Sequence, residues 1–159
     1  MWVPYELTNQ ERESDAYIDT LVDFIIAHPH QVLVDKHREK CQYIPQDRAS
    51  ARKIIKSVLD CEIVYVGTRH GRPMHPLAGF TYSEALGLAR LEYLVDYYSE
   101  SSSETATSFL TEALNKFLTF MLKNHSTIQE VVFPVPIPES PIGKYTVRTN
   151  NGRYFAYRT

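Results

Sequence analysis

The chain has 159 residues, of which 43% are hydrophobic and 23% charged, and its formal net charge is −2. This length suits one domain with its own core and is too short for two domains that each have one, so we expect residues 1–159 to form a single domain. No apolar run approaches the roughly 20 residues of a membrane span, and the N-terminus lacks the pattern of a secretory signal. Cys41 and Cys61 are too few for a disulfide framework. A cytoplasmic protein with reduced thiols is expected.

The N-terminal part of the chain predicts a short strand over residues 3–7 and then a helix. Ser14 is a suitable N-cap for that helix, and Pro29 ends it. The helix has an apolar stripe and an acidic stripe. The acidic stripe is most simply a solvent-facing surface, formed by Asp15, Asp19 and Asp23. Four histidines lack metal-ligand spacing, so no metal site is expected at His28, His30, His70 or His75.

A second helix is predicted over residues 48–59, with Asp47 as its N-cap. Its apolar residues face one side. The opposite side carries a basic ridge, formed by Arg48, Arg52 and Lys56. Two interpretations of this ridge stay open. It is either a solvated helix surface or a contact for an anion such as nucleic acid, an acidic partner or a cofactor phosphate.

Three consecutive strands come next and predict an antiparallel meander over residues 62–68, 77–82 and 89–97. The third, central strand has apolar residues at its odd positions. Its even positions carry Arg90, Glu92 and Asp96. This alternation is typical of a strand with one buried face. A helical alternative for residues 83–98 stays open, because the sequence LGLARLEYL is rich in leucine.

After the central strand come a serine-rich loop and the clearest helix of the chain. Apolar residues recur at steps of three and four from Ala106 to Met121, with polar residues between them. Ser101 followed by Glu104 can form a capping box at the start of the helix, and Ser103 is the competing cap. We therefore expect a long amphipathic helix that begins in or just after this loop.

The C-terminal residues 134–159 divide into a proline-rich arm and a hairpin. The strand expected over residues 128–135 runs into alternating prolines, which remove N–H donors along one edge and leave only the other edge free to pair fully. Asn150-Asn151-Gly152 is a strong hairpin signal. The aromatic residues of the hairpin form either a nucleic-acid or protein surface or packing against the sheet. No acid accompanies its basic residues, which are Lys144, Arg148, Arg153 and Arg158.

This order of elements, and the segments EIVYVGT, PLAGFTY and LARLEYLVDYYSESSSETATSFLTEAL, resemble the GNAT superfamily of acyl-CoA-dependent N-acetyltransferases. The resemblance implies an α+β fold: a mixed, mainly antiparallel sheet with flanking helices in a three-layer arrangement. In that family a loop of the type Q/R-x-x-G-x-G/A holds the cofactor pyrophosphate through backbone N–H groups and the dipole of the following helix. Here these loop positions fall on Ser101, Glu104 and Ala106, with Ser103 between them, and Glu104 replaces the first glycine.

The resemblance also implies an activity and its site residues. Acetyl-CoA would be the cofactor, and a small-molecule or protein amine would be the acceptor. Glu92 matches the carboxylate that deprotonates the amine, and backbone donors of the central strand, Val95 among them, would polarise the thioester carbonyl. By analogy, Tyr154 or Tyr157 would protonate the leaving thiolate.

Two other hypotheses stay open. The glycine-free loop, the proline-rich edge and the aromatic hairpin favour a GNAT-like scaffold without catalysis. Such a scaffold would be a binding or assembly protein, for example a phage-type structural or host-interaction protein. It could also form a homo-oligomer. Alternatively, Arg48, Arg52 and Lys56 would bind nucleic acid together with the C-terminal arginines, and that binding would weaken steeply with salt.

Overall fold

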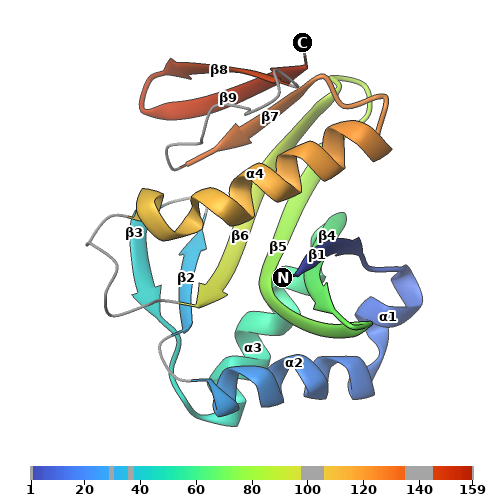
Figure 1. Ribbon diagram of the computed structural model, residues 1–159, viewed down its shortest axis with the longest axis vertical. Helices are drawn as coiled ribbons and strands as arrows, with labels where there is room; N and C mark the ends of the chain where they lie inside the picture. The colour runs from blue at the N-terminus through green and yellow to red at the C-terminus, as the bar shows by residue number, and fades with distance from the viewer. Residues whose placement is uncertain (1, 29–30, 36–37, 98–105, 135–144, 159) are drawn as a thin grey trace.

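The computed structural model describes residues 2–28, 31–35, 38–97, 106–134 and 145–158 (Figure 1). Its helices are α1 (Asn9–Glu13), α2 (Asp15–Ala27), α3 (Arg48–Leu59) and α4 (Ala106–Asn124). Its strands are β1 (Val3–Glu6), β2 (Gln31–Asp35), β3 (Arg38–Tyr43), β4 (Ile63–Arg69), β5 (Arg72–Ser83), β6 (Leu88–Tyr97), β7 (Glu130–Phe133), β8 (Tyr145–Asn150) and β9 (Arg153–Arg158).

The strands of these described residues form one sheet in the order β1-β4-β5-β6-β7-β9-β8, and the β2–β3 hairpin adds to β6. The β6–β7 pair is parallel, and every other pair in the described part of the chain is antiparallel. α4 lies across one face of the sheet, and α2 and α3 pack against the other (Figure 1). This arrangement confirms the expected fold class, an α+β protein with a mixed, mainly antiparallel sheet between layers of helices.

Local sequence signals correctly predicted the helices α2 and α3. The Ser14 side chain accepts a hydrogen bond from the backbone N–H of Tyr17 at the start of α2. Asp47 does the same for Ser50 at the start of α3, at 2.8 Å. Both helices match the predicted spans, because an N-cap fixes the end of a helix through bonds to residues two or three positions away. The short helix α1 was not predicted, although its capping box, Thr8 with Glu11, is visible in the sequence.

The central segment is the strand β6, so the helical alternative for residues 83–98 is wrong. Its predicted single buried face is also wrong. Gly79 of β5 pairs with Tyr93, but the next residue, Phe80, pairs with Leu91, so Glu92 is an extra residue in β6. Such a bulge reverses the direction of the side chains that follow it. Leu91 accordingly packs under α4, whereas Tyr93 packs against the core beneath α2 and α3.

The β2–β3 hairpin was not predicted. β2 runs antiparallel to β6 over the pairs from Gln31↔Tyr97 to Asp35↔Tyr93, and β3 pairs with β2. This segment lies between α2 and α3 in the sequence, yet it joins the sheet beside the second half of β6. The pairing depends on residues about sixty positions apart, and no local signal reports such a contact.

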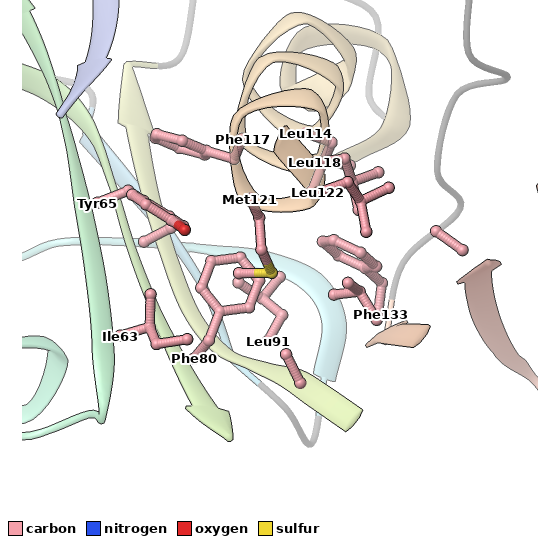
Figure 2. Close-up of a cluster of buried hydrophobic side chains, with 14 of the residues drawn as sticks. Ile63, Tyr65, Phe80, Leu91, Leu114, Phe117, Leu118, Met121, Leu122 and Phe133 are labelled. Atoms are coloured by element: carbon pink, nitrogen blue, oxygen red, sulfur yellow. The ribbon is translucent and has the colours of Figure 1, made fainter. Parts of the chain in front are cut away.

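The α4 side of the sheet holds an aromatic core (Figure 2). Tyr65 of β4 stacks on Phe117 of α4, with ring centroids 5.7 Å apart, and meets Phe80 of β5 edge-on. Phe133 of β7 packs against Phe80 from the other side. The predicted apolar stripe of α4 is confirmed from Ala113 onward, because these side chains are the ones buried there. The proposed caps Ser101, Ser103 and Glu104 lie outside the described residues.

The C-terminal hairpin is confirmed. Asn151 and Gly152 have positive φ values of 50° and 74°, as a tight two-residue hairpin turn requires. The preceding strand β7 is shorter than predicted and ends at Phe133. Pro134 follows it and is buried, whereas the other prolines of the arm lie outside the described residues.

Candidate functional site

Glu92 is the most distinctive polar residue of the sheet. Its side chain is only 5% exposed, and it is the one buried charged residue of the described chain. The hydroxyl of Thr81 on β5 donates to its Oε1 at 3.0 Å. Glu92 is therefore not a solvent-facing strand residue. A carboxylate buried in a sheet and held by a neighbouring hydroxyl is a suitable proton acceptor if a substrate reaches it.

The edge of β6 changes partner at Glu92. β7 pairs with β6 at Leu88, Ala89 and Arg90, and β2 pairs with the same edge from Tyr93 to Tyr97. Between these two pairings, no described strand pairs with this edge at Leu91 and Glu92. The bulge therefore coincides with a break in the ladder, which is where bulged strands commonly present backbone groups to a ligand.

Val95, the predicted backbone donor, has strands on both sides. It pairs with Leu77 of β5 and with Leu33 of β2. Each backbone N–H in an antiparallel sheet points toward one of the two neighbouring strands, so the ladder itself supplies a partner for the amide of Val95. The backbone N–H groups beside the break in the ladder therefore belong to residues that precede Val95 in β6.

The two predicted acid tyrosines lie on opposite faces of β9. Tyr154 packs against the core under α4. Tyr157 points to the other face, where the guanidinium carbon of Arg148 lies 4.1 Å from its ring centroid. Tyr157 therefore shares a face of the sheet with Glu92, although two strand spacings and several residues separate them, roughly 15 Å by ordinary sheet dimensions. The alternation of side chains along β9 places the two tyrosines on opposite faces, which was not predicted.

A third tyrosine, Tyr145, has a clear role in packing. Its hydroxyl donates to Oδ1 of Asn115 on α4 at 2.9 Å, and burial raises its pKa to about 12. It lies on the α4 face, away from Glu92. Burial raises the pKa of Tyr65 as well, further than that of Tyr145. Both groups stay protonated at neutral pH, so they strengthen the core rather than transfer protons there.

Three of the predicted cofactor contacts are in or beside the loop that precedes α4. Ser101 and Ser103 lie outside the described residues. Ala106 is the first residue of α4. The structure thus confirms that a long helix follows the loop, and the cofactor contacts stay predictions.

The predicted basic ridge of α3 faces the acidic stripe of α2. Nη1 of Arg48 lies 2.7 Å from Oδ1 of Asp23. Arg52 bridges two carboxylates, that of Asp15 at 2.9 Å and that of Asp19 at 2.7 Å. The acidic stripe is therefore an ion-pair surface rather than a purely solvated one. Because two of the three predicted cations already have carboxylate partners, this ridge is a weak anion site.

A shallow groove runs along the outer surface of α3, lined by Arg52, Lys53, Lys56 and Asp60 among others, and Glu92 is not part of its lining. Within the described ranges, no three His, Cys, Asp or Glu side chains are grouped as a metal site would require. Cys61 is buried, and its thiol donates to the backbone carbonyl of Ser57 at 3.8 Å. Of the helices that the structure describes, none combines the length and the apolar character needed to cross a membrane.

Comparison with known proteins identifies the fold. No family model matches the sequence, and no curated protein matches it. Among solved structures, the chain is similar to an aminoglycoside 6'-acetyltransferase type Ii, with a TM-score of 0.50 and 12% sequence identity. The match covers 99% of this chain and 96% of that chain. The likeness therefore extends over the whole chain, and the protein has a distant GNAT-like fold.

Proposed function

We propose that this protein is an acyl-CoA-dependent N-acyltransferase that acetylates an amine at the Glu92 bulge. The observation that carries the proposal is the position of Glu92, a buried carboxylate at the point where the β6 edge passes from β7 to β2. The GNAT-like fold supports it, because the solved structure to which the chain is similar is an acetyltransferase.

The residues at the bulge fit this chemistry in two respects. The carboxylate of Glu92 can accept the proton that an attacking amine loses, and Thr81 holds that carboxylate in place. The β6 edge at Leu91 and Glu92 has no described strand partner, so backbone groups there can orient a substrate carbonyl. Acetyl-CoA, when bound, would supply the acyl group as a thioester. Tyr157 shares the face of Glu92 but lies roughly 15 Å from it, and Tyr154 is on the opposite face, so water rather than either tyrosine would protonate the leaving thiolate.

Calorimetry with acetyl-CoA tests the proposal first, followed by an acetylation assay on a panel of amines. We expect cofactor binding, and we expect Glu92→Gln to retain that binding while lowering kcat/KM by at least about a hundredfold. Glu84→Gln, in the exposed turn before β6, is the matched control and retains full activity. No binding at millimolar acetyl-CoA by folded protein, or an unchanged rate in Glu92→Gln, contradicts the proposal.

Because a buried substitution can disturb folding, Thr81→Val provides an independent test. It removes the hydroxyl that donates to Glu92 and keeps the shape of the side chain. The carboxylate then loses the group that orients it, so kcat/KM should fall by about tenfold while acetyl-CoA binding is retained. A Thr81→Val enzyme with the kcat/KM of the parent would contradict the proposed role of Glu92.

A second candidate function is supported by the β2–β3 hairpin. β2 pairs with β6 from Tyr93 to Tyr97, directly beside Glu92, and so gives Val95 a partner strand where a cofactor would otherwise lie along the edge. This favours a GNAT-like scaffold without catalysis, which works by binding another protein. Light scattering combined with affinity capture tests it: a strict monomer that captures no partner and binds acetyl-CoA would contradict it.

A further inference from the structure

The sheet face opposite α4 carries a row of residues that the sequence does not bring together. Partners across neighbouring strands share a face. The row crosses five strands, β5, β6, β7, β9 and β8, through the successive partners Thr81, Arg90, Val132, Phe155 and Arg148. Arg90 and Arg148 therefore lie on one face, separated by a valine and a phenylalanine.

Strand β9 adds two further residues to this face. Side chains alternate along a strand, so Arg153 and Tyr157 point to the same side as Phe155. The rings of Phe155 and Tyr157 are 23° from parallel with centroids 6.4 Å apart. The guanidinium carbon of Arg148 lies 4.1 Å from the ring centroid of Tyr157. Two aromatic rings and the arginines around them thus share one surface, which we call the hairpin platform: Arg90, Arg148, Arg153, Phe155 and Tyr157.

No described helix covers the hairpin platform. α4 packs on the opposite face of β7 and β9. α2 and α3 lie at the other end of the molecule from the β7-β9-β8 portion of the sheet (Figure 1). The three arginines are exposed, and the two rings are partly exposed.

Among the described residues, the charge of the platform is only partly balanced by neighbours. Unlike Arg48 and Arg52 on α3, none of its arginines forms an ion pair within the described part of the chain. Glu130 lies in the adjacent row as the cross-strand partner of Tyr157, and the buried Glu92 accepts a hydrogen bond from Thr81, the cross-strand partner of Arg90. Three exposed arginines against these two carboxylates leave a net positive surface around the aromatic rings.

We propose that the hairpin platform binds single-stranded nucleic acid, independently of acyl transfer. Bases stack on Phe155 and Tyr157, and phosphates contact Arg90, Arg148 and Arg153. Positive charge attracts the phosphate backbone, and exposed aromatic rings on a sheet bind unpaired bases because every base has a flat face. A duplex hides those faces in its own stack, so the rings favour single strands. An acidic protein would use the arginines but not the rings.

Fluorescence anisotropy with labelled single-stranded DNA and RNA of about 12 nucleotides measures this binding. We expect affinity to fall with salt, with a log–log slope near −2 if all three arginines contact phosphate, since each contact contributes roughly −0.7. Arg148→Ala should weaken binding and reduce that slope by about 0.7. Tyr157→Leu and Phe155→Leu, which keep apolar bulk and remove the ring, should each weaken binding at least about fivefold without changing the slope.

Lys53→Ala and Lys56→Ala on α3 are matched controls, because each removes one exposed positive charge from another surface. They should leave affinity and slope unchanged. Circular dichroism verifies the fold of every variant, and the exposed Arg148→Ala keeps the test decisive if a ring variant fails to fold. The proposal is overturned by no binding at low salt, by equal losses in the α3 variants, by folded leucine variants that bind like the parent, or by equal competition from poly-glutamate.

Discussion

The guanidinium of Arg158 donates to the backbone carbonyl of Leu122 at 2.6 Å, joining the C-terminal strand to the end of α4. Its other nitrogens donate to the carbonyls of His125, at 2.8 Å, and Ile128, at 2.8 and 3.2 Å. The last carbonyls of a helix have no partner within the helix, and a cation there also interacts favourably with the helix dipole. One side chain therefore completes the C-terminus of α4 and anchors β9 beneath it.

Arg158→Ala should lower the free energy of unfolding by about 2–3 kcal/mol, because a partly buried, charge-assisted cap is lost and the carbonyls of Leu122 and Ile128 lose its donors. Urea denaturation followed by circular dichroism measures the change. Arg153→Ala is the matched control in the same hairpin, exposed and without a described hydrogen bond, and it should change stability by less than about 0.5 kcal/mol. Equal effects of the two substitutions would contradict the role of Arg158 as a C-terminal cap of α4.

Arg52 should stabilise the packing of α2 on α3 modestly and in a salt-dependent manner. It is 36% exposed and contacts Asp15 and Asp19, so Arg52→Ala should reduce stability by only about 0.5–1 kcal/mol at low salt. In 1 M salt the difference should largely vanish, because the ions screen an exposed pair. A double-mutant cycle with Asp19→Ala measures the coupling, and a loss that salt leaves unchanged would point to side-chain packing instead.

Gly79 is required by close packing of β5 on the end of α3. A Cβ built there would lie 2.7 Å from Sγ of Cys61 and 2.8 Å from the carbonyl oxygen of Val58. Gly79→Ala should therefore reduce stability by about 1–3 kcal/mol. Adding Cys61→Ala should recover only part of this loss, because the Val58 oxygen belongs to the backbone and remains. Thermal unfolding should rank the parent as the most stable, the double variant next and Gly79→Ala last. Full recovery in the double variant would show that the clash involves the thiol alone.

The carboxylate of Asp47 should make the stability of the fold depend on pH. The backbone N–H of Ser50 donates to its carboxylate and, with further bonds at the cap, holds its pKa below the ordinary value of 3.8. A carboxyl group whose pKa is lower in the folded state stabilises the fold above its unfolded pKa, and this contribution disappears as the pH falls below that value. Asp47→Asn keeps a capping side chain but does not titrate.

We therefore expect the Asp47→Asn variant to match the parent near neutral pH and to lose less stability than the parent between pH 5 and pH 2. Urea midpoints across that range measure the difference. Parallel curves for the two proteins at every pH would show that the cap does not depend on the charge of Asp47.

Short-range chemistry explains why much of the secondary structure was predictable. Ser14 and Asp47 mark the starts of α2 and α3, and Asn151-Gly152 marks the hairpin, because caps and tight turns depend on a few neighbouring residues. The resemblance to GNAT proteins rests on the same kind of signal, the succession of elements. It correctly gave the fold class.

Contacts between distant segments explain the errors. The bulge at Glu92 is defined by the register of β6 against β5, and it moved Tyr93 and Val95 to the face opposite that of Leu91. The ion pairs of Arg48 and Arg52 depend on how α2 packs beside α3. Register and packing cannot be recognised in a local sequence pattern, so most elements were predicted but the β2–β3 hairpin and the ion pairs between α2 and α3 were not.

By itself, then, the sequence determined where α2, α3, the three-strand meander and the C-terminal turn lie, since propensity, capping and periodicity act over a few residues. Only the tertiary structure decided that Glu92 is buried, that β2 lies beside it, and that Arg90 and Arg148 share one face with Phe155. These properties follow from strand order and register, which are set by burying apolar surface from the whole chain at once.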